Sequence, residues 1–259
     1  MNAAEFSALP DVQRMSATAV AYKALGEFAP ANGQSLFGGK LLLCAGLNDV
    51  GYAYSLAMSI AGGTFLGIER RPQRLKEALR DGVCDYMVNS LDEALRVLKN
   101  EIRKKTPVSV GLLGEVAGVL QEVTERGVQP DFVVLGGMSA DAKMFDTLEE
   151  RGAVDVAGAD VPAEPILLVA SAASPSTLRM FERVVLEVVR GPAAFGRKWA
   201  ESSARYFRRT TPPMRSALVD EAQVAAVEQG LRGQGLDGDL LLGIQGTDRS
   251  WRMESFAAA

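Results

Sequence analysis

The fold of this chain is decided by the stretch Leu41-Leu42-Leu43-Cys44-Ala45-Gly46-Leu47-Asn48-Asp49-Val50-Gly51. Its first five residues form a short apolar run that ends at a glycine, which is typical of a strand buried in a parallel sheet. A helical pattern follows at Tyr52–Ala61, and a second apolar run follows at Thr64–Ile68. Strand, tight turn, helix and strand in this order predict a right-handed βαβ unit.

The alternation of short apolar runs with helical patterns continues along most of the chain. Further strands are expected at Ser109–Leu113, Phe132–Leu135 and Ile166–Ala170, and further helices at Pro72–Arg80, Leu91–Lys105, Glu115–Arg126 and Pro175–Val189. The pattern is less regular over residues 136–163. Strands that alternate with helices of about 10 to 15 residues form parallel sheets. We therefore predict an α/β fold, a Rossmann-like, doubly wound and mainly parallel sheet in which all the expected strands are neighbours.

The whole chain, residues 1–259, is expected to form one domain. Its sheet core covers about residues 33–190, and helical additions flank this core at both ends. The N-terminal addition is a helix within residues 1–32, and the C-terminal addition is a helical extension over residues 191–259. Within this extension, Leu240–Ile244 is either a late strand or a packed tail.

The composition excludes several classes of protein. A net charge of −4 argues against nucleic acid as a partner, because phosphate binding needs a basic surface. Cys44 and Cys84 are too few for a disulfide framework, and no apolar segment is long enough to cross a membrane. The first residues lack the pattern of a secretory signal, so we expect a cytoplasmic protein. The absence of histidine removes the commonest zinc ligand and general base, and we expect no metal site.

The turn after the first strand is a candidate phosphate loop. Gly46 and Gly51 have the spacing of the first and last glycines in G-x-G-x-x-G, with Asn48 at the middle position. A tight turn at Gly46 and close helix packing at Gly51 would offer the N–H groups of a helix N-terminus to an anion. Glu69 ends the second strand, 18 positions beyond Gly51, where a ribose-binding carboxylate belongs. The spacing predicts a dinucleotide whose pyrophosphate lies over Gly46–Gly51.

Other interpretations of these residues exist. Glu69 could face solvent at an ordinary strand end. Asp49 opposes a phosphate: at about 5 Å and an effective dielectric of about 20, the repulsion costs about 3 kcal/mol. Asp49 could also cap the helix itself and occupy the N–H groups that a phosphate would use. Arg70, Arg71 and Arg74 either form a solvated helix start or contact an adenine or a 2′-phosphate.

Six stretches of the sequence carry a pattern beyond that of a generic βαβ unit. They are Ser35–Gly51, Ala61–Gly63, Glu69, Leu91–Leu95, Ser109–Gly114 and Glu125–Asp131. The last two are the most specific. Together the six stretches resemble the NAD-binding region of the urocanase (urocanate hydratase) family, and the resemblance covers about residues 33–135.

In that family NAD⁺ is held tightly and acts as an electrophile without net redox change. The resemblance implies that Asp49–Gly51 line the pyrophosphate loop and that Glu69 holds the adenosine ribose. It places Arg74 near the adenosine end, and Glu115 and Val116 near the nicotinamide ribose. The expected cofactor site consists of Gly46, Asn48, Asp49, Val50, Gly51, Glu69, Arg74, Gly114, Glu115, Val116, Gly136 and Gly137.

The chain departs from the family at positions that carry its chemistry. Glu115-Val116 stands where the family has Asn-Ala, and Gly136–Ala140 stands where it has Gln-Thr-Ser-Ala-His. The family's catalytic region, with its functional cysteine, has no visible counterpart, so we do not expect hydration of urocanate. The candidates for acid–base chemistry are Glu115, Asp141 and Tyr52.

The function expected from these features is that of a urocanase-like, NAD-binding protein. It would be a diverged enzyme of the lyase or hydratase type that acts on a small molecule. The alternative is a catalytically silent module that keeps the Rossmann core to bind a dinucleotide or another small ligand, or to assemble. In either case we expect a homo-oligomer, a dimer, because the helical additions at both ends need a surface to pack against.

Overall fold

The computed structural model describes residues 1–29, 36–135, 142–163, 165–189, 195–207 and 209–257. Contacts within the chain group these residues into two compact units. The antiparallel unit contains the described residues of 1–23 and 161–259, and the parallel unit contains those of 24–31 and 35–160. The sequence was expected to give one domain, whereas each unit here has its own sheet.

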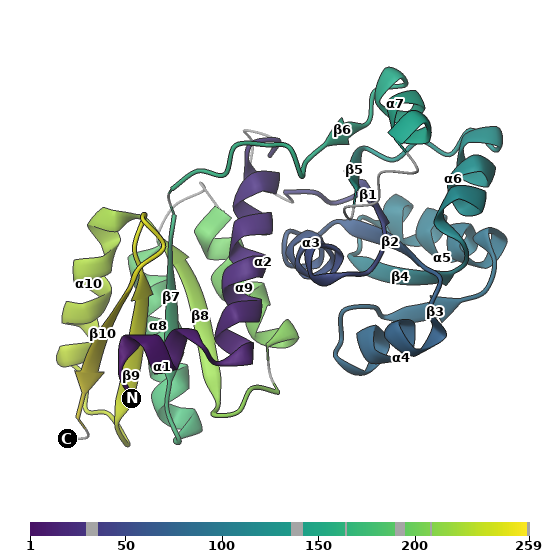
Figure 1. Ribbon diagram of the computed structural model, residues 1–259. Helices are drawn as coiled ribbons and strands as arrows, with labels where there is room; N and C mark the ends of the chain where they lie inside the picture. The colour runs from purple at the N-terminus through teal and green to yellow at the C-terminus, as the bar shows by residue number, and fades with distance from the viewer. Residues whose placement is uncertain (30–35, 136–141, 164, 190–194, 208, 258–259) are drawn as a thin grey trace. The chain divides into compact units, whose positions relative to one another are not determined.

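The parallel unit is built on a six-stranded sheet (Figure 1). Its strands are β1 (Leu41–Ala45), β2 (Thr64–Glu69), β3 (Tyr86–Val88), β4 (Val108–Leu113), β5 (Phe132–Leu135) and β6 (Val154–Asp155). All pairings are parallel, in the order β3-β4-β2-β1-β5-β6. From the central strand β1 the chain first builds outward through β2 and later returns to add β5 on the other side. The order therefore reverses between β1 and β5, which makes this a doubly wound, Rossmann-like sheet.

Helices cover both faces of this sheet. They are α3 (Asp49–Ile60), α4 (Pro72–Arg80), α5 (Leu91–Lys104), α6 (Val116–Glu125) and α7 (Ala142–Glu150). One face packs against α5, α6 and α7 through a cluster of buried side chains that includes Leu98, Leu120 and Phe145. On the other face, Leu75 of α4 packs on Gly111 of β4. Because both faces are covered, β1 and β2 are buried at every position, which explains their continuous apolar sequence.

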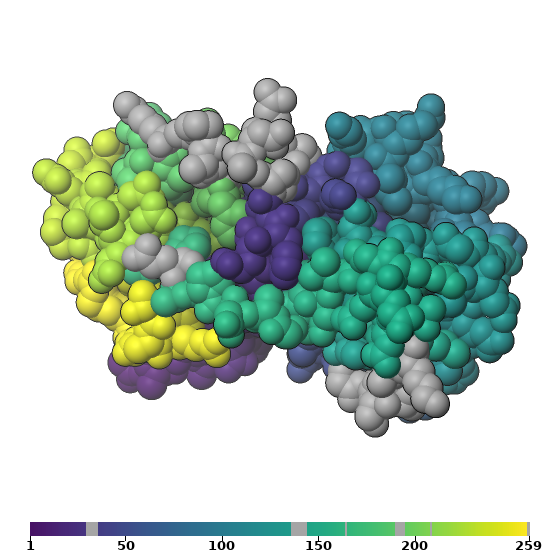
Figure 2. Space-filling model, turned by 90° about the horizontal axis from the view of Figure 1, so that it is seen from above, coloured from purple at the N-terminus to yellow at the C-terminus, as the bar shows by residue number. Residues whose placement is uncertain are grey.

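The antiparallel unit has a four-stranded sheet of order β10-β9-β7-β8. Its elements are α1 (Ala3–Ser7), α2 (Pro10–Gly26), β7 (Ile166–Ser171), α8 (Pro175–Val188), α9 (Phe195–Tyr206), β8 (Met214–Val219), α10 (Glu221–Arg232), β9 (Leu240–Gln245) and β10 (Trp251–Phe256). One face of the sheet packs against α8 and α10. The first helix lies beside the last strand (Figure 2). Phe6 of α1 meets Trp251 of β10 edge to face, with 5.6 Å between the ring centroids. None of the described helices is long and apolar enough to span a membrane.

Two expectations for the second half of the chain are wrong. Ile166–Ala170 does not join the parallel sheet but lies at the centre of the antiparallel one, as β7. The region expected as a helical extension contains the strands β8, β9 and β10, so Leu240–Ile244 is a strand and not a packed tail. The cause is that β7, like β1, is buried on both faces, and a continuous apolar run does not distinguish a parallel strand from a central antiparallel one.

Candidate functional site

The carboxyl ends of four parallel strands lie side by side and bring the predicted site residues to one edge of the sheet. Ala45 of β1 pairs with Ile68 on one side and with Leu135 on the other. The pairing extends one residue into the loops, because Gly46 N donates to Ile68 O at 3.0 Å and Gly114 N donates to Glu69 O at 3.1 Å. Gly46, Glu69 and Gly114 are therefore neighbours beside the β1–β5 switch point, where sheets of this kind bind ligands.

The β1–α3 loop, residues 46–48, has the tight geometry that its glycines predict. Gly46 has a φ of +99°, and a Cβ placed there would meet none of the described heavy atoms within 4 Å, so the space beside the loop is open. At Gly51 the reverse holds. A Cβ would stand 2.3 Å from the main-chain oxygen of Gly46 and 3.2 Å from Cys44 Sγ. Only glycine lets the first turn of α3 pack this closely on the loop.

The first turn of α3 is capped by Asn48. Its Oδ1 accepts from Gly51 N at 3.0 Å, and its main-chain oxygen accepts from Tyr52 N at 2.8 Å. The alternative that Asp49 caps the helix is therefore wrong: Asp49 is the first helical residue, and its side chain is fully exposed. The N–H groups of Asp49 and Val50 have no acceptor within the helix, since they belong to its first turn. They remain at the positive end of the helix dipole, which favours an anion.

Arg74, in the first turn of α4, contacts this loop from the side. Its Nε donates to Leu47 O at 2.6 Å, and its Nη2 lies 3.2 Å from Asp49 Oδ1. The guanidinium also stands over the ring of Tyr52, with 5.5 Å between Cζ and the ring centroid. The resemblance places Arg74 near the adenosine end of a cofactor; in this structure its donors engage its own chain.

Glu69 is buried at the end of β2, so the interpretation that it faces solvent is wrong. Only 4% of the residue is exposed. Its Oε1 accepts from both the main-chain N and the Nε of Arg71, each at 3.0 Å. Burial acts to raise the pKa of Glu69, but the hydrogen bonds from Arg71 and the charges of Arg71 and Arg74 outweigh it, so the pKa lies below its ordinary value. Glu69 is a charged acceptor beside the loop.

The strand β4 contributes less to the site than the sequence predicts. Glu115 occupies the N-cap position of α6 with its side chain exposed and makes no capping hydrogen bond. The side chain of Val116 is buried in the core with that of Leu120, so it does not line the sheet edge. Val116 could contribute only its main-chain N–H to a ligand.

The other predicted catalytic groups do not form an acid–base centre among the described residues. Burial raises the pKa of Tyr52 to about 12, partly opposed by the charge of Arg74, and its hydroxyl donates to the main-chain oxygen of Arg74 at 3.2 Å. Cys44 and Cys84 are buried, and burial raises the pKa of both thiols. Asp141 lies outside the described residues, as do Gly136 and Gly137.

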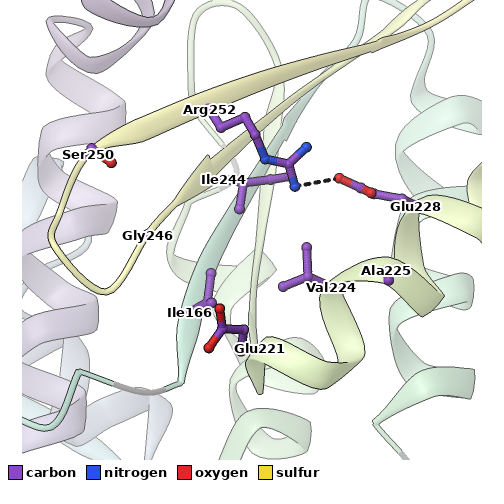
Figure 3. A pocket seen from close by; sticks show the side chains of 9 residues that line it. All are labelled: Ile166, Glu221, Val224, Ala225, Glu228, Ile244, Gly246, Ser250 and Arg252. Carbon is purple, nitrogen blue, oxygen red and sulfur yellow. Dashed lines mark hydrogen bonds and ion pairs between the residues drawn. The ribbon is translucent and has the colours of Figure 1, made fainter.

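A pocket of about 430 Å³ lies in the antiparallel unit, between α10 and the β9–β10 hairpin (Figure 3). Its floor is apolar, and the side chains of Arg252 and Glu228 form an ion pair at 2.7 Å across one side. Glu221 lies on the opposite side. Sequence reasoning did not single out these residues, which belong to elements far apart in the chain. The pocket lies outside the parallel unit and takes no part in the sheet-edge site.

Sequence reasoning also missed how Arg71 and Asn48 act at the sheet edge. Arg71 looks like a solvated residue but fixes the Glu69 carboxylate. In the sequence, Asn48 stands out only as the middle position of the glycine pattern. Its preference for the N-cap, which exceeds that of most residues, was a usable indication.

Fold and site together define a Rossmann-like α/β protein with a tight, glycine-containing loop at the switch point of a parallel sheet. Residues 19–141 match the family model of the urocanase Rossmann-like domain. The match covers just under half of the chain, and it supports a relationship of this region to the Rossmann-like domain of the urocanase family. The matched region runs from within α2 to just beyond β5, so it includes the β1–α3 loop and Glu69. The resemblance that the sequence shows over about residues 33–135 is thus confirmed.

Proposed function

We propose that the parallel unit binds NAD⁺ and that the protein is a urocanase-like, NAD-binding protein. One observation carries the proposal: Gly46, where a Cβ would meet none of the described atoms within 4 Å, precedes the first turn of α3 and hydrogen-bonds Ile68 O, next to the buried Glu69. A dinucleotide needs an anion site and a hydroxyl acceptor at this spacing. The match of residues 19–141 to the urocanase Rossmann-like domain supports the same ligand.

The charges of the loop fit a pyrophosphate despite the presence of Asp49. Its carboxylate is paired with Arg74 Nη2 at 3.2 Å and is otherwise exposed to solvent. The guanidinium offsets the repulsion expected between Asp49 and a phosphate, and solvent screens the remainder. The positive end of α3 adds a favourable contribution.

The residues that would hold the cofactor follow from this geometry. Gly46–Asn48 and the first turn of α3 would receive the pyrophosphate, and the second oxygen of Glu69 would accept from a ribose hydroxyl. That oxygen is the freer one, because its contact with Arg71 Nη2 is long, at 3.5 Å. When bound, NAD⁺ supplies an electrophilic ring. Two carboxylates are proposed to move protons on a small-molecule substrate. They are Glu115, at the N-cap of α6 just after β4, and Asp141.

A second candidate function, a binding module without catalysis, is favoured by the state of the side chains at the sheet edge. Tyr52 is held protonated and donates to Arg74, and Glu69 is held ionised by Arg71. A general acid or base works best with a pKa near the working pH. Neither group meets this condition, and the chain has no histidine to replace them.

The proposal is tested by calorimetric titration of the purified protein with NAD⁺. We expect binding, and we expect Glu69→Ala to weaken it by about tenfold or more, because a charged acceptor is lost. Glu150→Gln is the matched control. Glu150 is exposed at the end of α7, a helix that leads into the start of β6 and so ends near the opposite edge of the sheet. Equal affinities of Glu69→Ala and the wild type would mean that the site is misplaced.

The two candidate functions are separated by what happens after binding. An enzyme would convert a substrate class in the presence of NAD⁺, and Glu115→Gln would slow that conversion more than it weakens NAD⁺ binding. A binding module would show NAD⁺ affinity without turnover of any α,β-unsaturated acid in a panel screened by absorbance. Turnover that is lost in Glu115→Gln would reject the module.

A further inference from the structure

Arg74 connects α4 to the β1–α3 loop and to the first turn of α3. It extends from the first turn of α4, and its side chain is 29% exposed. Its Nε and Nη2 reach Leu47 O and Asp49 Oδ1, the residues on either side of the capping residue Asn48. One guanidinium therefore spans the cap of α3 with two donors. The fixed fork of an arginine allows this, whereas the single ammonium group of a lysine cannot reproduce it.

Leu47 is the point at which this contact acts on the loop. The Leu47 side chain is fully buried and packs on Gly67 of β2. With the side chain fixed inward, the orientation of the next peptide group depends on what its carbonyl oxygen binds. The bond from Arg74 Nε, at 2.6 Å, is the contact that the structure gives this oxygen. That peptide group leads directly into Asn48 and so sets the start of α3.

Tyr52 of α3 also contacts Arg74, through both its ring and its hydroxyl. Its ring lies beneath the guanidinium of Arg74, and its hydroxyl donates to the main-chain oxygen of Arg74. Three contacts thus connect the first turn of α4 with the β1–α3 loop and the start of α3. They are the contacts of Arg74 with Leu47, Asp49 and Tyr52. This closed set of contacts holds the guanidinium in place against the loop.

We infer that Arg74 is a positioning residue, which sets the conformation of the β1–α3 loop and so directs the first N–H groups of α3 toward the ligand. It acts chiefly through its hydrogen bond to Leu47 O. Its effect on NAD⁺ affinity rests on the proposed function, whereas its effect on the loop does not.

The experiment measures the loop and the ligand separately. Hydrogen–deuterium exchange is followed in peptides that cover residues 46–53 of the ligand-free protein, where the amides of Gly46, Gly51 and Tyr52 are hydrogen-bonded. We expect Arg74→Gln to speed this exchange by about tenfold, as loss of a part-buried hydrogen bond to a charged group would. NAD⁺ affinity should fall by about tenfold in the same variant.

Three further variants locate the effect. Arg74→Lys keeps the charge but lacks the fixed fork that places Nε on Leu47 O, so exchange should be faster than in the wild type. Asp49→Asn keeps the bond to Leu47, so exchange should stay within about twofold of the wild-type rate, since exposed ion pairs contribute little. Arg70→Gln is the control, because Arg70 is an exposed arginine of the same segment.

The outcomes separate this inference from the proposed function. If wild-type protein does not bind NAD⁺, the proposed function fails, and the exchange rates still decide the role of Arg74. Wild-type exchange rates in both Arg74 variants would overturn the inference. Weaker NAD⁺ binding without faster exchange would also overturn it, because Arg74 would then be a ligand contact. If Arg74→Gln does not fold, faster loop exchange in a folded Arg74→Lys protein supports the inference, and unchanged exchange rejects it.

Discussion

Glu69 accepts two hydrogen bonds from Arg71, one from its main-chain N and one from its Nε, each at 3.0 Å. The two residues lie two positions apart, so this contact is confined to the turn that follows β2. The carboxylate is buried, yet the pKa of Glu69 lies below its ordinary value because Arg71 and Arg74 stabilise the ionised form more than burial destabilises it. A buried, ionised acceptor is thus ready at the sheet edge near neutral pH.

This pair makes the stability of the protein depend on pH. A carboxylate whose pKa is lowered by folding adds stability above the unfolded value of about 4.3, and this contribution is lost as the pH falls through the folded pKa. Glu69→Gln should therefore be less stable than the wild type at pH 7, and the difference should shrink below about pH 4.3. Urea denaturation at a series of pH values measures it, with Glu150→Gln as control. A difference that does not change with pH would contradict the prediction.

Gly51→Ala should destabilise the protein strongly. The added Cβ would stand 2.3 Å from the main-chain oxygen of Gly46, which cannot move without changing the loop. We expect a loss of about 1–3 kcal/mol in the free energy of unfolding. Gly118→Ala is the matched control, since Gly118 is also helical and a Cβ there meets none of the described atoms within 4 Å. It should stabilise by up to about 1 kcal/mol. Similar effects of the two changes in urea denaturation would contradict this account of the loop.

The chain should not hydrate urocanate at a meaningful rate. It has no histidine, and Tyr52 and Glu69 are both held in protonation states unsuited to moving a proton near neutral pH. Loss of a positioned acid–base group costs about 10²–10⁴-fold. The test incubates the protein with NAD⁺ and urocanate and follows the absorbance of urocanate. Turnover of about one per second or faster, a rate within the range of ordinary enzymes, would contradict the prediction.

We also propose that the protein is a dimer. Light scattering at micromolar concentration should then give about twice the chain mass of 27.6 kDa. The chain mass itself, unchanged on dilution and concentration, would reject the proposal.

The sequence predicts most of the parallel unit, because the local patterns of its strands and turns agree with the sheet that they form. Gly46 and Gly51 predict a turn and a close packing that the structure contains, and four of the expected strands form one parallel sheet. The short strands β3 and β6 escape prediction because two or three residues carry no periodicity. The contacts of Arg74 escape it too, because they depend on where α4 lies relative to the loop. The separate sheet that holds β7 depends on pairing with strands β8 and β9, which follow it by more than 40 and more than 60 residues.

The central claim is that NAD⁺ binds over the β1–α3 loop of the parallel unit. Titration of ¹⁵N-labelled protein with NAD⁺, followed by the main-chain amide signals, tests its location directly. The account predicts that the largest shifts occur at Gly46, Asp49 and Val50, with further shifts at Glu69, and that the amides around Arg252 in the antiparallel unit do not move. Saturating NAD⁺ without shifts at the loop, or with the largest shifts in the antiparallel unit, would contradict it.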